Sequence, residues 1–111
     1  MAILEIIRNK RDGNALSDEE IAQFVNELAD GSCPPEQAAA LAMAIYLNGM
    51  GFPETATLTR AMASSGTVID WHAQNLCGPA LDKHSTGGIG DKVSLILAPL
   101  VAACGGFVPM V

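Results

Sequence analysis

The chain has 111 residues, half of them hydrophobic, which is enough to build one domain with a core of ordinary size. Six basic residues against twelve acidic ones give a net charge of −6 at pH 7. This excess of negative charge opposes broad electrostatic binding to nucleic acid or to an anionic membrane surface. Any anion that the protein binds must therefore be held locally, by a few positive groups.

The sequence shows no sign of a membrane segment or of export. Its apolar runs are far shorter than the ~20 residues that a membrane-spanning helix needs. An acidic residue, Glu5, stands where a secretory signal peptide would carry positive charge. Three cysteines, Cys33, Cys77 and Cys104, are widely spaced and form no CxxC pair, so we expect reduced thiols and no zinc site. These features predict a cytoplasmic protein.

The first 66 residues predict a small all-helical domain. Apolar residues at positions 3, 4, 6 and 7 fit one face of a helix over residues 3–11, which Gly13 ends. Ser17 and Glu20 form a capping box at the start of the next helix, which Gly31 closes. The side chains expected in the buried stripe of that helix are Ile21, Phe24, Val25 and Leu28.

Two further helices complete this domain. The third is predicted from Glu36 to about Asn48, and the fourth from near Pro53 to Gly66. The third helix contains "AAALAMAIYL" and is apolar on nearly every side, so it must be covered all round. We expect the fourth helix to supply part of that cover and a group outside these helices, such as a second subunit, to supply the rest.

Beyond the fourth helix the sequence has mixed polarity without a helical pattern, and residues 67–78 predict a connector. Residues 79–82 ("PALD") predict a short strand, and residues 92–104 predict an apolar helix that Pro99 kinks or breaks. The closing "FVPMV" predicts a second strand, parallel to the first. Residues 79–111 are therefore expected to form one β–loop–α–β unit, the start of an α/β domain.

The stretch "DKHSTGGIGDKVS", residues 82–94, joins the predicted strand to the predicted helix. Glycines let a backbone approach a ligand closely, and the free N–H groups at a helix amino terminus attract anions. Lys83 and Lys92 are the only lysine or arginine residues after Arg60, so the positive charge of the second half is concentrated in this stretch. The pattern predicts a site for phosphate or a phosphorylated ligand, and a tight turn without a ligand is the alternative.

The candidate groups in this stretch are one ammonium, three hydroxyls and the backbone of three glycines. They are Lys83, Ser85, Thr86, Ser94, Gly87, Gly88 and Gly90. Their spacing fits neither the GxxxxGK[ST] phosphate loop nor the GxGxxG dinucleotide motif. Beside them, His84 is equally well an ordinary hydrogen-bonded histidine, while Asp82 and Asp91 suit structural roles at the strand end and the helix start.

The motif "KHSTGGIGD" and the stretches "EIIRNKRDGNALSDEEI", "LTRAMASSGTVIDW" and "APLVAACGGFVPM" resemble the amino-terminal portion of the pyrimidine nucleoside phosphorylase family, most closely its thymidine phosphorylases. The likeness runs along essentially the whole chain. It implies that residues 1–66 are a small helical domain that forms homodimers and one wall of a cleft. It also implies that residues 67–78 are a connector, and that residues 79–111 begin the α/β domain.

The resemblance implies reversible phosphorolysis, in which phosphate attacks C1′ of thymidine or deoxyuridine to give the base and 2-deoxy-α-D-ribose 1-phosphate. Matched by position, the phosphate-binding residues would be Lys83, Ser85, Thr86, Gly87, Gly88 and Ser94. His84 would face the pyrimidine, and Lys83 and His84 are the catalytic candidates. No cofactor is implied, because phosphate is a substrate. No metal is expected either, because Lys92 stands near the place where some family members hold potassium.

The resemblance also limits what these residues can do. The groups that hold the base in this family would follow position 111, so we expect the 111 residues alone to be inactive. The alternatives are a pyrimidine nucleoside phosphorylase of broader specificity, a phosphoribosyltransferase of the anthranilate type, and a helical dimerisation module without catalysis. The motif "KHSTGG", in place of a "GTGGD" core, weighs against the phosphoribosyltransferase.

Overall fold

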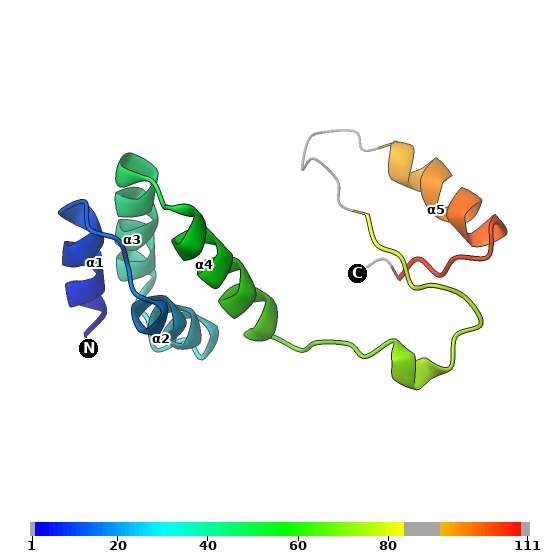
Figure 1. Ribbon diagram of the computed structural model, residues 1–111, viewed down its shortest axis with the longest axis horizontal. Helices are drawn as coiled ribbons and strands as arrows, with labels where there is room; N and C mark the ends of the chain where they lie inside the picture. Colours follow the sequence, from blue (N-terminus) through cyan, green and yellow to red (C-terminus); the bar gives the residue numbers. More distant parts are fainter. Residues whose placement is uncertain (1, 84–91, 110–111) are drawn as a thin grey trace. The chain divides into compact units, whose positions relative to one another are not determined.

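The computed structural model describes residues 2–83 and 92–109 of the chain. The chain divides into two compact units, unit 1 (residues 1–68) and unit 2 (residues 69–111). Unit 1 is a bundle of helices, and unit 2 is built around a single longer helix with irregular segments (Figure 1).

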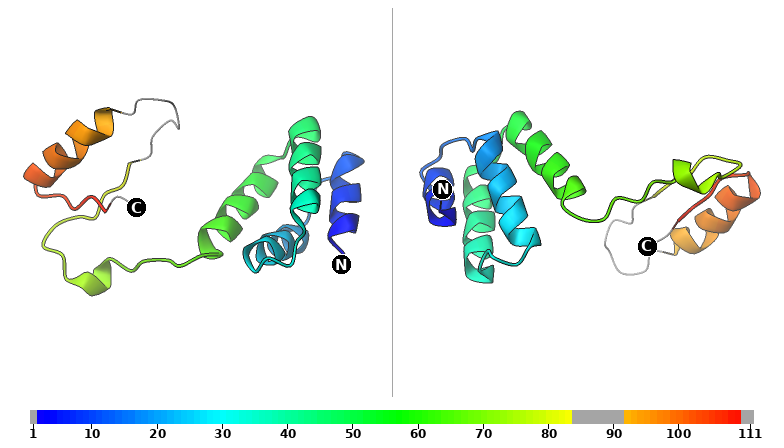
Figure 2. Two further views of the ribbon diagram at one scale, coloured as in Figure 1. Left: turned by 180° about the vertical axis from the view of Figure 1, so that it is seen from behind. Right: turned by 90° about the horizontal axis from the view of Figure 1, so that it is seen from below.

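Unit 1 contains four helices, as the sequence predicts, and their ends lie within one or two residues of those expected. The helices are α1 (Ile3–Arg11), α2 (Asp18–Ala29), α3 (Pro35–Asn48) and α4 (Phe52–Ser64). In the bundle α1 packs on α3, while α4 packs mainly on α2 (Figure 2). The four helices thus form two packed pairs that share one core.

The helix ends confirm the predicted capping. Ser17 Oγ accepts a hydrogen bond from the N–H of Glu20 at 3.2 Å, and Glu20 Oε2 accepts one from the N–H of Ser17 at 2.8 Å. This reciprocal pair satisfies two N–H groups that the first turn of α2 would otherwise leave without partners. Gly13 follows α1 with φ +86°, and Gly31 follows α2 with φ +81°. In this left-handed region glycine avoids the strain that a Cβ atom would cause.

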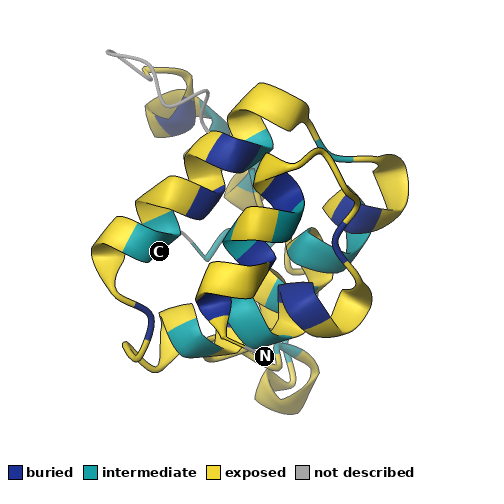
Figure 3. Cartoon of the chain, turned by 90° about the vertical axis from the view of Figure 1, so that its left-hand side faces the viewer, coloured by how far each residue is buried: buried dark blue, intermediate teal, exposed yellow. Residues whose placement is uncertain are grey.

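The core of unit 1 comes from α1, α2, α3 and the loops that join them. Its buried members are Ile3, Ile6, Leu16, Ile21, Val25, Cys33 and Leu41. Buried and exposed positions alternate along the helices, so each contributes a stripe rather than a whole surface (Figure 3). In the predicted stripe of α2, Phe24 is partly buried, but Leu28 is 44% exposed and that expectation is wrong. Helical periodicity predicts on which face of a helix a residue lies. It does not predict how far along the helix neighbouring elements cover that face.

One side of α3 stays uncovered within unit 1. Leu41 and Ala44 are buried, whereas Met43, Tyr46 and Leu47 are 57%, 83% and 72% exposed. The sequence predicts that α4 covers part of α3, but α4 packs mainly on α2 instead. The apolar sequence of α3 therefore predicts more burial than this unit provides.

Unit 2 contains a short 3-10 helix, η1 (His72–Gln74), and α5 (Val93–Ala103). The bounds of α5 agree with the predicted helix over residues 92–104. The helix continues through Pro99 and is not broken there. Leu95, Ile96 and other apolar side chains of α5 are exposed. Of the helices in residues 2–83 and 92–109, none combines the length and the apolar character needed to cross a membrane.

The two strands predicted to flank α5 are not formed within the described residues. A single parallel bridge joins Ala80 and Phe107 in their place. The N–H of Leu81 donates to the carbonyl oxygen of Phe107 at 2.8 Å, and the N–H of Phe107 donates to that of Pro79 at 2.9 Å. Of the predicted β–α–β unit the helix is present, while the strand pair is represented in the described residues by one bridge. An isolated parallel pair has few hydrogen bonds and lacks the neighbouring strands and buried faces on which parallel sheets depend.

A close backbone contact accompanies this bridge. A Cβ atom placed on Gly78 would lie 2.2 Å from the carbonyl oxygen of Gly105. The segment before the bridge and the turn after α5 therefore touch where there is no room for a side chain.

Candidate functional site

The structure describes the two ends of the predicted phosphate loop. Lys83 lies at its start and Ser94 at its end. The other residues predicted in this stretch, His84, Ser85, Thr86, Gly87, Gly88, Gly90 and Asp91, lie outside the described residues. The described part of the site therefore consists of the groups that flank these residues.

Lys83 follows the bridged segment and is half-buried. Its N–H donates to Asp82 Oδ1 at 2.8 Å, which is the structural role predicted for Asp82. Together with Leu97 and Val101 of α5, Lys83 lines a small hollow of about 30 Å³. Lys83 and one face of α5 therefore lie side by side within unit 2.

The amino-terminal end of α5 supplies the second set of groups. Lys92 immediately precedes the helix and is exposed, while Ser94, in its first turn, is 8% exposed. The first N–H groups of a helix have no partner within it, and they carry the positive end of the helix dipole. A lysine at position 92 and a serine at position 94 thus stand at the positive end of a helix, a combination of residue types that favours an anion.

A larger hollow of unit 2 lies elsewhere and was not predicted. It has a volume of about 630 Å³ and is lined by the connector, including Trp71, His72 and Asn75. Asn75 takes a left-handed conformation with φ +49°, and the N–H of His72 donates to Asp70 Oδ1 at 2.9 Å. Neither Lys83 nor Ser94 lines this hollow, and the carboxylate of Asp70 in its wall repels anions. Lys83 and α5 remain the better candidate for phosphate.

The cysteines and acidic groups suggest no second kind of site. Within the described ranges, no three of the His, Cys, Asp and Glu side chains gather closely enough to hold a metal ion. All three cysteines are free, with Cys33 buried and Cys77 and Cys104 exposed. Burial raises the pKa of the Cys33 thiol, which keeps it protonated and poorly nucleophilic. Cys33 accordingly acts as a packing residue.

Comparison with known protein families identifies the family to which the helical bundle belongs. Residues 4–66 match the family model of the helical bundle domain of a glycosyl transferase family. The match spans more than half of the chain and nearly all of unit 1, so the chain belongs to this family. The domain occurs in anthranilate phosphoribosyltransferases and in pyrimidine nucleoside phosphorylases, which are pentosyltransferases. The helical bundle thus shows membership of this class of pentosyltransferases. It does not indicate the substrate, which must be inferred from the segment that follows the bundle.

Proposed function

We propose that this chain supplies the helical domain and the phosphate-binding loop of a thymidine phosphorylase. In this reaction inorganic phosphate attacks C1′ of thymidine or deoxyuridine and the bond from C1′ to the base breaks. The products are the free base and 2-deoxy-α-D-ribose 1-phosphate. Membership of the family supports pentosyl transfer. The motif "KHSTGGIGD" supports phosphate as the acceptor rather than anthranilate.

The observation that carries this proposal is the position of Lys83 between the bridged segment and α5. The chain runs from the bridge at Ala80 through Lys83 and a glycine-rich stretch into the amino terminus of α5. This is the order of elements in which many folds bind phosphate, at the amino end of a helix that follows a strand. Residues 79–111 would accordingly begin an α/β domain whose first two strands meet at this bridge.

The residues fall into two roles in this proposal. The groups that orient and hold phosphate are Lys83, Ser85, Thr86, Ser94 and the backbone of Gly87 and Gly88. An oriented phosphate dianion close to C1′ lowers the barrier to attack, because positioning is achieved before the reaction. His84 would face the pyrimidine and donate to it, which stabilises the negative charge that develops on the leaving base.

We also propose a homodimer formed through unit 1. The uncovered side chains of α3, Met43, Tyr46 and Leu47, provide an apolar surface of the kind that a second copy covers. Sedimentation at several concentrations measures this association. A chain that stays monomeric at all concentrations contradicts the dimer and leaves the phosphate site untouched.

Lys83 gives the sharpest test of the phosphate site. In a complete enzyme that contains these residues, Lys83→Ala removes a charge-assisted contact of roughly 1.5 to 3 kcal/mol, so the phosphate KM rises by about ten- to a hundredfold. Arg60→Ala, which removes a cation from exposed α4, is the matched control and leaves this KM unchanged. An unaltered phosphate KM in Lys83→Ala contradicts the assignment.

The reaction itself is tested by omitting phosphate. Thymidine is consumed only when phosphate is present, and thymine release without phosphate contradicts phosphorolysis. Binding of phosphoribosyl pyrophosphate in place of phosphate and thymidine would instead support a phosphoribosyltransferase.

A further inference from the structure

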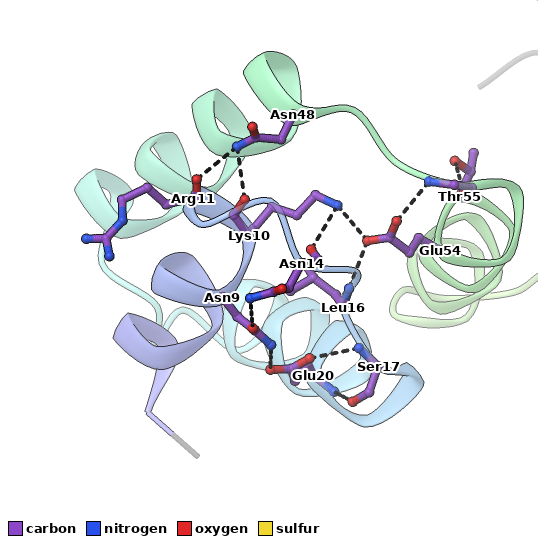
Figure 4. A network of polar contacts seen from close by, with 11 residues as sticks. Asn9, Lys10, Arg11, Asn14, Leu16, Ser17, Glu20, Asn48, Glu54 and Thr55 are labelled. Carbon is purple, nitrogen blue, oxygen red and sulfur yellow. Dashed lines mark hydrogen bonds and ion pairs between the residues drawn. The ribbon is translucent and has the colours of Figure 1, made fainter.

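A buried carboxylate joins α4 to the rest of the bundle (Figure 4). Glu54 Oε1 accepts hydrogen bonds from Lys10 Nζ at 2.7 Å and from the N–H of Leu16 at 2.9 Å, and its Oε2 accepts one from the N–H of Gly51 at 2.8 Å. Lys10 is 3% exposed and Glu54 is 7% exposed. This one side chain therefore links the start of α4 to α1 and to the loop between α1 and α2.

Apart from Glu54, α4 is held by an exposed hydrogen bond from Thr57 Oγ1 to Asp18 Oδ1 of α2 at 2.7 Å and by partial apolar burial. Glu54 is its one buried residue, while Leu58 and Ala61 are partly buried against the core. Phe52 and Met62 of the same helix are 87% and 57% exposed. Each of α1, α2 and α3 buries apolar side chains, and α4 buries none completely. Elements with few buried apolar contacts open at lower free energy than the core that they cover.

A polar link between α1 and α3 does not involve Glu54. Asn48 Nδ2, at the end of α3, donates to the carbonyl oxygens of Lys10 and Arg11 at 3.0 Å and 3.2 Å. These bonds fix the last turn of α1 to α3 whether or not α4 is in place. When α4 leaves, α1 and α3 keep their packing against each other, whereas α2 loses the helix on which it mainly packs.

We propose that α4 opens from the bundle as one unit, and that Glu54 is the latch that holds it closed. The chain passes through α4 on its way to unit 2, so this opening lengthens the segment that joins the bundle of α1, α2 and α3 to unit 2. The proposal concerns unit 1 alone and does not depend on the proposed reaction.

The energetics of the latch follow from its burial. In the closed state Lys10 and Glu54 have lost their water, and their mutual contact compensates for that loss. When α4 opens, both groups return to water. If the charge of Glu54 is removed, the Lys10 ammonium is buried without an ionic partner in the closed state. The open state has no such free-energy penalty, so the substitution favours opening.

Native-state hydrogen exchange of the 111-residue chain at low guanidinium concentrations tests this proposal. Amides of α4 are expected to exchange through an opening with a weaker denaturant dependence and lower protection than those of α1 and α3. Glu54→Gln lowers the protection of α4 by about ten- to a hundredfold. It lowers the protection of α1 and α3 by the same factor, because complete unfolding starts from the same closed state.

A core substitution separates the two openings. Ile6 is completely buried in α1, and because α1 packs mainly on α3 we expect it to stay buried when α4 leaves. Ile6→Val therefore lowers the protection of α1 and α3 by about two- to tenfold and leaves that of α4 unchanged. Glu5→Gln, which removes the exposed pair with Arg8 at 2.6 Å, is the control for loss of a carboxylate and leaves α4 unchanged.

Two results would overturn the proposal. If Ile6→Val lowers the protection of α4 as much as that of α1, the bundle opens as a whole and α4 is not a separate unit. If Glu54→Gln leaves α4 protection at its original value, Glu54 is not the latch. The original chain and Ile6→Val decide the first point even if Glu54→Gln does not fold.

Discussion

Glu54 illustrates how opposing effects set the charge of a buried carboxyl group. Burial disfavours its ionised form and raises its pKa. The N–H of Leu16, the ammonium of Lys10 and the N–H of Gly51 stabilise the ionised form and together outweigh burial, so the pKa of Glu54 lies below its ordinary value. The carboxylate is therefore charged at neutral pH, and the fold depends on that charge.

The stability of unit 1 should consequently fall in acid. Because the pKa of Glu54 is lower in the folded than in the unfolded state, its stabilising contribution is complete well above the ordinary carboxyl pKa of about 4.3 and is lost as the pH falls through the folded value. We expect Glu54→Gln to be less stable than the original chain by about 2 kcal/mol at pH 7. Urea unfolding followed by circular dichroism at a series of pH values should show this gap closing as the pH falls below the ordinary carboxyl range and the carboxyl group of folded Glu54 protonates. A gap that stays constant over this range argues against the charged pair.

Single residues differ in how visible their roles are in the sequence. Ser17 and Glu20 lie three residues apart, and the capping box that they form could be predicted from spacing alone. Lys10 and Glu54 are 44 residues apart, and nothing local marks them as partners. In a helical sequence, a lysine and a glutamate are normally solvated, and burial of this pair depends on how α1 and α4 pack.

At the scale of elements, α5 and the bridged segments show what an isolated pair of strands lacks. The helix forms where its apolar sequence predicts it and tolerates Pro99. The two flanking segments meet in the predicted parallel direction, yet one bridge is all that forms in the described residues. Local sequence determines the helix, while a parallel sheet requires neighbours that this segment does not contain.

The contact between Gly78 and Gly105 should be sensitive to a single methyl group. Gly78→Ala places a Cβ atom 2.2 Å from a carbonyl oxygen, so the backbone must move apart at a cost of roughly 1 to 3 kcal/mol, as in other overpacked sites. We expect the amide resonances of Leu81 and Phe107 to shift toward unpaired values. Gly66→Ala is the matched control, because nothing lies within 4 Å of a Cβ atom there. Equal effects of the two substitutions would show that the contact is unimportant.

At the scale of the whole molecule, the two units differ in their cores. Every buried hydrophobic residue in the described part of the chain lies in unit 1. Unit 2 has Ser94 as its buried residue among those described, and its apolar helix is largely exposed. Apolar burial is the main source of folding free energy, so unit 1 carries most of the stability.

Residues 1–68 should therefore fold without unit 2. We expect a chain of these residues to retain its helical circular dichroism and to unfold in one cooperative transition, because it keeps the whole core. The same measurement on residues 69–111 is expected to show no cooperative transition. Loss of the transition from the shorter chain of residues 1–68 would show that unit 2 contributes to the core.

The parts of the candidate site also differ in how far they could be predicted from the sequence. The glycine-rich pattern and the two lysines could be recognised in the sequence, and the described positions of Lys83 and Ser94 beside and within α5 fit an anion site. The roles of Lys83 and Ser94 stay predictions, as do those of His84 and of the residues up to Gly88, which lie outside the described residues. The connector hollow beside Trp71 could not be predicted, because it depends on the left-handed turn at Asn75 and not on a motif.

The carboxylate of Glu54 performs two tasks with its two oxygens, closing the first turn of its own helix through Gly51 and reaching across to Lys10 and Leu16. Glu54→Asp keeps the charge but shortens the reach by one methylene, so a single aspartate can complete one of these tasks and must abandon the other. Reach, as much as charge, is what this position requires of an amino acid.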